Sequence, residues 1–313
     1  MKNIDEKTVK SFGDEWNRFD QSALSQSEKS TMFNKYFHIF PWEKISLNSV
    51  GFDMGCGTGR WAQFVTSKVK ILNCVEPSDA IYVAKKNLIN NKNVKFLKET
   101  TENCSLTLGS QDFGYCLGVL HHIPNTQQAL NDCTKLLKSG APILLYLYYN
   151  FENKPVWFKA LWQVSDYIRK FISVSPKPIK QSLVALIALL VYFPFSRLAY
   201  VLEKIGLNVE NIPLADYRKK PFYQCKNDAL DRFGTRLEQR FSKSQITEML
   251  TKSGCKGVMF SPKTLNILAI LMSIPCVSQY DIAIPSEAYL IAAYGEGGLK
   301  TSFSEKDVLF LES

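Results

Sequence analysis

Residues 50–62 read Val50-Gly51-Phe52-Asp53-Met54-Gly55-Cys56-Gly57-Thr58-Gly59-Arg60-Trp61-Ala62. The apolar start of this stretch predicts a buried strand, its glycine-rich middle a tight turn, and its end the beginning of a helix. The glycines have the spacing GxGxG, whereas the dinucleotide fingerprint requires GxGxxG. Glycine adopts backbone angles that other residues avoid and leaves no side chain between a ligand and the main chain. The turn is therefore predicted to bind a ligand, with amides at the helix start available to a carboxylate.

Two acidic residues stand at predicted strand ends beside this turn. Asp53 lies at the end of the first strand, where a carboxylate can face an ammonium group directly or through water. Glu76 ends the second strand, 17 residues after Gly59, and an acidic side chain at that place can accept both hydroxyls of a ribose. Together these residues predict a ligand that has an amino-acid part and a ribose.

The segment from Asn48 to Asn150 alternates short apolar runs with helix-like stretches, which predicts stacked βα units and a mostly parallel α/β sheet. Five strands are expected, at residues 50–54, 71–76, 94–97, 113–117 and 142–149. A strand near residues 258–261 and another at 289–294 are expected to complete the sheet as an antiparallel C-terminal edge. Residues 262–287 form an apolar interruption between them.

Four segments follow from this pattern. They are a helical N-terminal cap over residues 1–47, a Rossmann-like core over 48–150, a helical basic insertion over 151–240, and a C-terminal helix with strands and a tail over 241–313. The formal net charge is +9, and residues 151–260 hold 18 Lys/Arg against 9 Asp/Glu. Eight cysteines without a CxxC pair are expected to be reduced core residues.

The region resembles the class I S-adenosylmethionine-dependent methyltransferases, specifically the group often labelled methyltransferase type 11. The resemblance rests on the glycine-rich turn, on Leu117 to Pro124 after the fourth strand, and on Leu145 to Tyr149 at the fifth. Asp228 to Phe241 looks like a stretch typical of one bacterial subgroup. The resemblance implies a Rossmann-like enzyme that uses S-adenosylmethionine as methyl donor and needs no metal.

The resemblance also implies which residues hold the donor. They are Asp53, Gly55, Cys56, Gly57, Thr58, Gly59, Glu76, Thr101, Glu102 and Leu117. Similar enzymes usually place Asp-Ala after the third strand to hold the adenine, whereas the matching positions here are Thr100 and Thr101. A backbone contact from Thr101 remains expected, and a carboxylate contact at position 100 does not.

His121 and His122 follow the fourth strand, at the edge of the sheet where ligands of open α/β folds bind. Either could act as the catalytic base for a hydroxyl acceptor, and either could instead pack in the core or cap the next helix. The basic and aromatic insertion suits a small-molecule, saccharide or lipid-linked acceptor methylated on oxygen. The alternatives are an RNA methyltransferase, which would need a nucleic-acid site not evident in the sequence, and an NAD-dependent oxidoreductase.

The charged start of the chain lacks the apolar core of a signal peptide, which favours a cytoplasmic protein. The uncharged run from Gln181 to Ser196 is expected to form a buried helix. Lys177, Lys180 and Arg197 bracket this run and support the alternative of a peripheral membrane contact through residues 181–200, on the inner face of the membrane.

Overall fold

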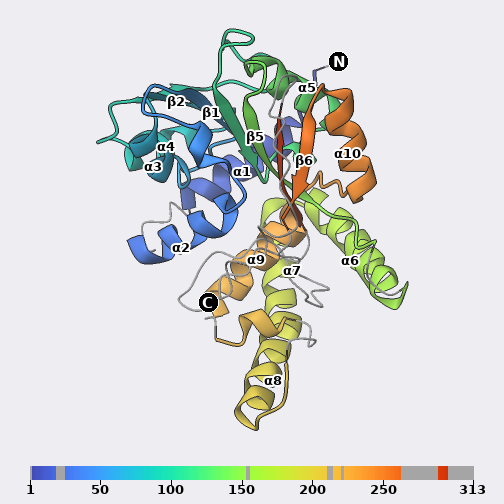
Figure 1. The fold of residues 1–313 in the computed structure, drawn as a ribbon. Coiled ribbons are helices and arrows are strands. Elements are labelled where there is room, and N and C mark those ends of the chain that lie inside the picture. Colours follow the sequence, from blue (N-terminus) through green and yellow to red (C-terminus); the bar gives the residue numbers. More distant parts are fainter. Residues whose placement is uncertain are drawn as a thin grey trace.

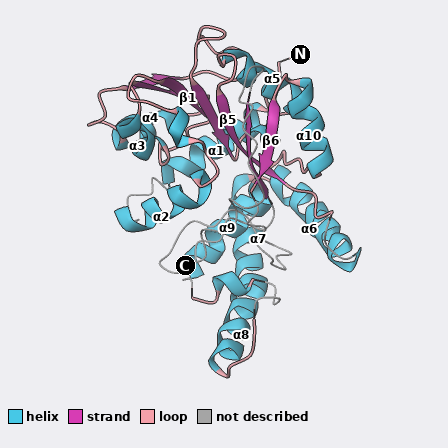
Figure 2. Cartoon of the chain, in the orientation of Figure 1, coloured by secondary structure: helices cyan, strands magenta, loops and turns pink. Residues whose placement is uncertain are grey.

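The computed structural model describes residues 2–18, 25–152, 156–209, 214–219, 222–261 and 288–294. Its centre is a sheet with the strand order β3-β2-β1-β4-β5-β7-β6 (Figures 1 and 2). The first five strands in the chain are parallel and confirm the predicted Rossmann-like fold. They are β1 (Val50–Met54), β2 (Ile71–Val75), β3 (Val94–Leu97), β4 (Phe113–Leu117) and β5 (Pro142–Tyr148).

Both faces of the parallel sheet are covered, as expected for strands without a polar side. Alternate residues of β5 enter two separate cores: Leu144 and Tyr146 pack on one face, and Ile143 and Leu145 on the other. The α-helices before β5 are α1 (Glu6–Arg18), α2 (Gln26–Phe37), α3 (Ala62–Val65), α4 (Ala80–Asn87) and α5 (Thr126–Leu136). Trp61 and the α2 residue Phe37 belong to the first core, and α5 contributes to the second.

The C-terminal elements lie beside β5. Strand β7 (Ala288–Tyr294) runs antiparallel to β5, and β6 (Lys256–Phe260) runs antiparallel to β7. Helix α10 (Lys243–Lys252) begins with the capping box of Ser242 and Gln245, in which each residue's side chain accepts a backbone N–H bond of the other. The apolar interruption at residues 262–287 lies outside the described residues.

The insertion projects from the sheet as a helical arm, which we define as residues 156–234 (Figure 1). It contains α6 (Val156–Val174), α7 (Lys177–Ile187), a π-helical turn (Ala188–Tyr192), α8 (Phe193–Lys204) and α9 (Phe222–Gly234). The arm has a core of its own that includes Ile172, Val184, Tyr192, Tyr217 and Phe233. It is therefore a packed unit rather than a long loop.

A buried charge cluster joins the arm to the sheet. The carboxylate of Glu238 lies 3.3 Å from Arg232 of α9 and 2.9 Å from Arg240, and all three side chains are at most 5% exposed. Arg240 also donates to the carbonyl oxygen of Tyr149 at the end of β5. Arg169 of α6 donates to the carbonyl oxygen of Thr235 at 2.8 Å. The stretch that resembles a bacterial subgroup in the sequence is thus the joint between arm and sheet.

We expect Glu238→Gln to lower the free energy of unfolding by about 3–5 kcal/mol, because it leaves two buried guanidinium groups without their counter-charge. Burial alone would raise the pKa of Glu238, but the charges of Arg232, Arg240 and Arg169 lower it from 4.5 to about 2. The contribution of this carboxylate is therefore complete above pH 4.5 and is lost as the pH falls toward 2.

Thermal unfolding followed by circular dichroism between pH 3 and 7 measures both effects. Glu248→Gln is the matched control, because Glu248 is 62% exposed and pairs with Lys252 on the same helix. Equal melting temperatures for the two variants would show that the cluster does not stabilise the joint.

Candidate functional site

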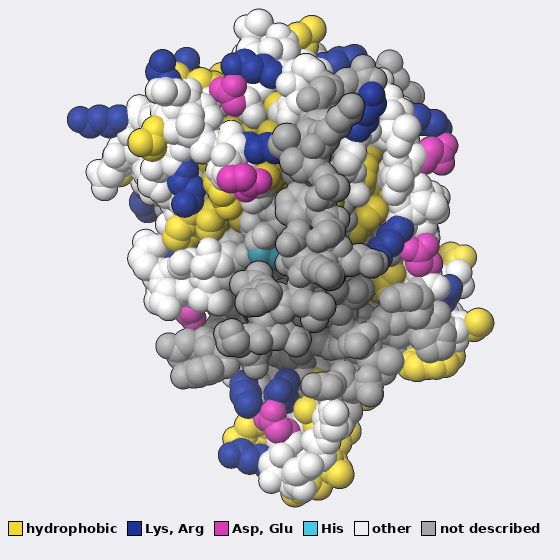
Figure 3. Space-filling model, in the orientation of Figure 1, with side chains coloured by type: hydrophobic (Ala, Val, Ile, Leu, Met, Phe, Trp, Pro, Cys, Tyr) yellow, Lys and Arg dark blue, Asp and Glu magenta, His cyan; other side chains and the backbone are white. Residues whose placement is uncertain are grey.

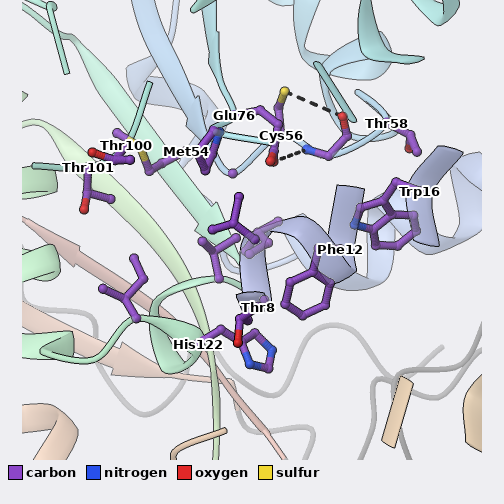
Figure 4. A pocket seen from close by; sticks show the side chains of 18 of the residues that line it. Thr8, Phe12, Trp16, Met54, Cys56, Thr58, Glu76, Thr100, Thr101 and His122 are labelled. Atoms are coloured by element: carbon purple, nitrogen blue, oxygen red, sulfur yellow. Dashed lines mark hydrogen bonds between the residues drawn. The ribbon is translucent and has the colours of Figure 1, made fainter. Parts of the chain in front are cut away.

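A cavity opens at the carboxyl ends of β1, β2 and β4, the edge where open α/β sheets bind ligands (Figure 4). The glycine-rich turn forms one wall and α1 the opposite wall. The predicted site residues that line it are Gly55, Cys56, Gly57, Thr58, Glu76, Thr101, Leu117 and His122. Asp53, Gly59, Glu102 and His121 are not among its lining residues.

The three glycines of the turn have backbone φ angles of +77°, +52° and +76°, in the left-handed region that favours glycine. A Cβ atom at Gly55 would lie 2.3 Å from a methyl group of Val119, and one at Gly59 would lie 2.7 Å from Leu88. At Gly57 the nearest atom would be the indole nitrogen of Trp16, 3.6 Å away. Gly55 and Gly59 thus allow close packing, while Gly57 keeps the main chain open toward the cavity.

Glu76 is held at the end of β2 by two backbone amides. One carboxylate oxygen accepts from the N–H of Gly57 at 3.1 Å (Figure 4), and the other accepts from the N–H of Ser78 at 2.9 Å. The side chain is 7% exposed. Each oxygen retains a further lone pair, so the carboxylate can accept two hydroxyl groups without losing its amide bonds.

Asp53 lies beneath the turn and is 1% exposed. Burial raises the pKa of its carboxyl group to about 8; the hydroxyl of Tyr115 opposes this shift, and the charge of Glu76 adds to it. A carboxyl group with this pKa is mostly protonated at pH 7, and a cation nearby would favour its ionised form. Because Asp53 does not line the cavity, the direct contact with an ammonium group that the sequence predicts is not seen here.

The threonine end of the cavity differs from the pattern of similar enzymes. Thr100 and Thr101 both line the cavity, and the Thr101 hydroxyl is buried without a hydrogen-bond partner in the part of the chain that the structure describes. Such a group is available to a polar edge of a ligand. Glu102 instead accepts from the backbone N–H of Asn3 at 2.9 Å, and so ties the N-terminal segment to this loop.

The two adjacent histidines have different places. Nδ1 of His122 lies 2.7 Å from the carbonyl oxygen of Leu237, and the ring borders the cavity near Thr8 (Figure 4). The ring of His121 is fully buried and stacks on Tyr148 with 3.9 Å between ring centroids. Burial, together with the charges of His122 and Arg240, holds the pKa of His121 well below its ordinary value. The geometry thus brings only His122 to the cavity.

Several cavity residues are not evident from the sequence. The α1 residues Thr8, Phe12 and Trp16 line the opposite wall, with Trp16 near the glycine-rich turn and Thr8 beside His122 (Figure 4). Phe12 contacts the His122 ring at 4.9 Å, and Arg60 lies over the Trp16 ring at 5.4 Å. In the sequence the spacing of Phe12 and Trp16 predicts only an apolar helix face, because nothing in it shows that the helix covers a cavity.

Residues 52–145 match the family model of a methyltransferase domain. No curated protein matches the chain significantly. Among solved structures, the YcgJ protein of Bacillus subtilis is 14% identical, with 88% of this chain and 100% of that chain covered and a TM-score of 0.45. An S-adenosylmethionine-dependent methyltransferase of Thermotoga maritima is 16% identical, with 90% and 100% covered and a TM-score of 0.42. The family match confirms the resemblance to the type 11 group, and the bacterial subgroup stays a prediction.

We expect Glu76→Ala to weaken the binding of S-adenosylhomocysteine, the product of the expected donor, at least tenfold, because it removes a charged acceptor of two ribose hydroxyls. Titration calorimetry measures the affinity. Asp79→Ala is the control, since the Asp79 side chain is 66% exposed and pairs with Lys98. An affinity for Glu76→Ala equal to that of the control would remove Glu76 from the site.

Proposed function

We propose that this chain, whose residues 52–145 match a methyltransferase domain, is an S-adenosylmethionine-dependent enzyme that methylates an oxygen atom of a small-molecule, saccharide or lipid-linked acceptor. The observation that carries this proposal is the orientation of His122 at the cavity. A hydroxyl acceptor needs a group that takes its proton, whereas many other acceptors do not.

The residues of the turn fit the donor. We infer that Glu76 accepts the ribose hydroxyls, that Asp53 acts on the ammonium group through water from beneath the turn, and that the amides at the start of the helix after the turn meet the carboxylate. At the adenine end we assign Thr101, with Leu117 packing on the base. When bound, S-adenosylmethionine supplies a methyl group on a sulfonium, and its loss leaves a neutral thioether.

His122 has the protonation state that a base requires. A carbonyl oxygen only accepts hydrogen bonds, so Nδ1 carries the ring proton toward Leu237 and Nε2 keeps its lone pair. Burial lowers the pKa of His122 to about 4, although the bond to Leu237 opposes the shift, so the ring is neutral at pH 7. In the proposed step, Nε2 takes the hydroxyl proton while the acceptor oxygen forms its bond to the methyl carbon.

The charge of the cavity argues against nucleic acid as the acceptor. Five carboxylates line it against the single guanidinium of Arg60; they belong to Asp5, Glu15, Glu76, Glu99 and Asp228. Such a lining repels a phosphodiester chain and favours a neutral acceptor group near the reacting centre. The family match likewise favours S-adenosylmethionine over NAD.

We expect His122→Gln to lower methyl transfer at least 100-fold while S-adenosylhomocysteine binding stays unchanged, because the amide cannot take the proton. Transfer is measured with labelled donor and a cell extract separated into glycan, lipid, nucleic-acid and small-molecule fractions. His38→Gln is the matched control, because Nδ1 of His38 also lies 2.7 Å from a backbone carbonyl oxygen but the residue is exposed and outside the cavity lining.

Full activity of His122→Gln would contradict the role of His122, and label only in the nucleic-acid fraction would contradict the acceptor class. The pH profile gives an independent test. Because the pKa of His122 is about 4, we expect no loss of rate from this group between pH 8 and 6, and a fall as the pH approaches 4. A half-maximal rate near pH 6.5 would contradict the assignment.

A further inference from the structure

The long helix of the arm, residues 177–204, is apolar on two faces. One stripe is buried in the arm at a spacing of three or four residues: Val184, Ala188, Tyr192, Ser196 and Ala199. A second stripe is equally apolar but lies on the outside. It contains Leu186, Leu189, Leu190, Leu198 and Val201, which are 49–61% exposed. A helix that meets only water on its outer face ordinarily carries polar residues there.

The size of this helix matches a lipid layer. Residues Lys177–Lys204 form a helix that is long and apolar enough to cross a membrane, and only 28% of its most apolar 18 residues is buried. At 1.5 Å per residue the helix is about 42 Å long. Because its other face packs on α9, which contains Lys226, Asp228 and Arg232, the helix can place one face in lipid but cannot be surrounded by it.

The charges beside the outer stripe suit an anionic surface. Residues 177–209 contain the four basic residues Lys177, Lys180, Arg197 and Lys204 and one acidic residue, Glu203, so the net charge is +3 (4 − 1). Arg197 lies over the ring of Phe193 at 4.7 Å, and Lys204 over the ring of Tyr200 at 5.6 Å. Charged Lys and Arg side-chain ends that lie over aromatic rings are suited to the boundary between lipid and water. The same positive charges disfavour a second copy of the chain as the occupant.

Helix α6 gives a second, independent stripe of the same kind. Trp157, Val164, Tyr167, Phe171 and Val174 recur at helical spacing and are 53–71% exposed. Lys170 lies over the ring of Tyr167 at 5.5 Å. Figure 3 shows hydrophobic side chains at the outer ends of the arm, with Lys and Arg side chains beside them.

We propose that the outer stripe of residues 186–201 docks the protein on the surface of an anionic lipid bilayer, with the helix lying in the interface. As a consequence that rests on the proposed function, the methyl acceptor is a membrane-borne molecule. A cleft between α1 and α7 supports this second part. Four lysines (Lys7, Lys10, Lys177 and Lys180) and two carboxylates (Asp14 and Glu15) line it; Lys177 lies 3.6 Å from Asp14, and Glu15 also lines the donor cavity. The basic side chains can therefore hold an anionic headgroup in this cleft, while the neutral group that is methylated enters the donor cavity.

The test uses the full chain and sedimentation with vesicles of phosphatidylcholine, alone or with about a third of phosphatidylglycerol. We expect binding to the anionic vesicles and at least tenfold weaker binding to the neutral ones. Leu186→Ser/Leu190→Ser, which changes one turn of the outer stripe, should weaken binding to anionic vesicles at least tenfold. Leu47→Ser/Leu108→Ser is the matched control, because these leucines are 71% and 68% exposed but lie outside the arm.

Circular dichroism and S-adenosylhomocysteine binding show whether each variant is folded. Equal binding of both double variants, or equal binding to both kinds of vesicle, would overturn the proposal. So would a failure to bind vesicles combined with a dimer that Leu186→Ser/Leu190→Ser dissociates, since a second copy would then be the occupant. The vesicle assay needs no methyl donor, so its failure is distinct from a failure of the proposed enzymatic function.

Discussion

The hydrogen bond between the Gly57 amide and the Glu76 carboxylate is the interaction on which the donor site depends. It joins the turn after β1 to the end of β2, two elements that pair in the sheet. The turn reaches Glu76 only because its glycines adopt left-handed backbone angles, and Gly55 leaves no space for a Cβ atom beside Val119. The sheet register, the turn geometry and the direction of the carboxylate therefore depend on one another, and a change in one would alter the other two.

The arm buries charged side chains at its base and exposes apolar side chains along its length. At its base, Arg232, Glu238 and Arg240 are removed from water and neutralise one another within the joint. Along its length, leucines and valines that could fill a core remain on the outside. Burying charged groups costs free energy unless each charge is closely paired, so the cluster is stable only when the joint has this one geometry. Exposing a row of leucines and valines to water also costs free energy, and the proposed contact with lipid removes that cost.

Local patterns in the sequence predict most of the donor half, because the strands, the glycine-rich turn and Glu76 are close together in the chain and their roles depend on spacing. Those patterns do not distinguish His121 from His122, since the difference arises from Leu237 and Tyr148, which lie on other elements. They also miss Thr8, Phe12 and Trp16 as cavity residues, and they predict a buried helix where Leu186 to Val201 have an exposed face. In each case the missing information is a contact distant in sequence.

The bond from His122 to Leu237 also has a consequence for the order in which the molecule assembles. It closes a loop of 115 residues that contains the whole arm. Contacts of such separation form late, because the chain between them must first become compact. The bond between Gly57 and Glu76 spans only 19 residues, whereas the orientation of His122 depends on the arm having folded back onto the sheet.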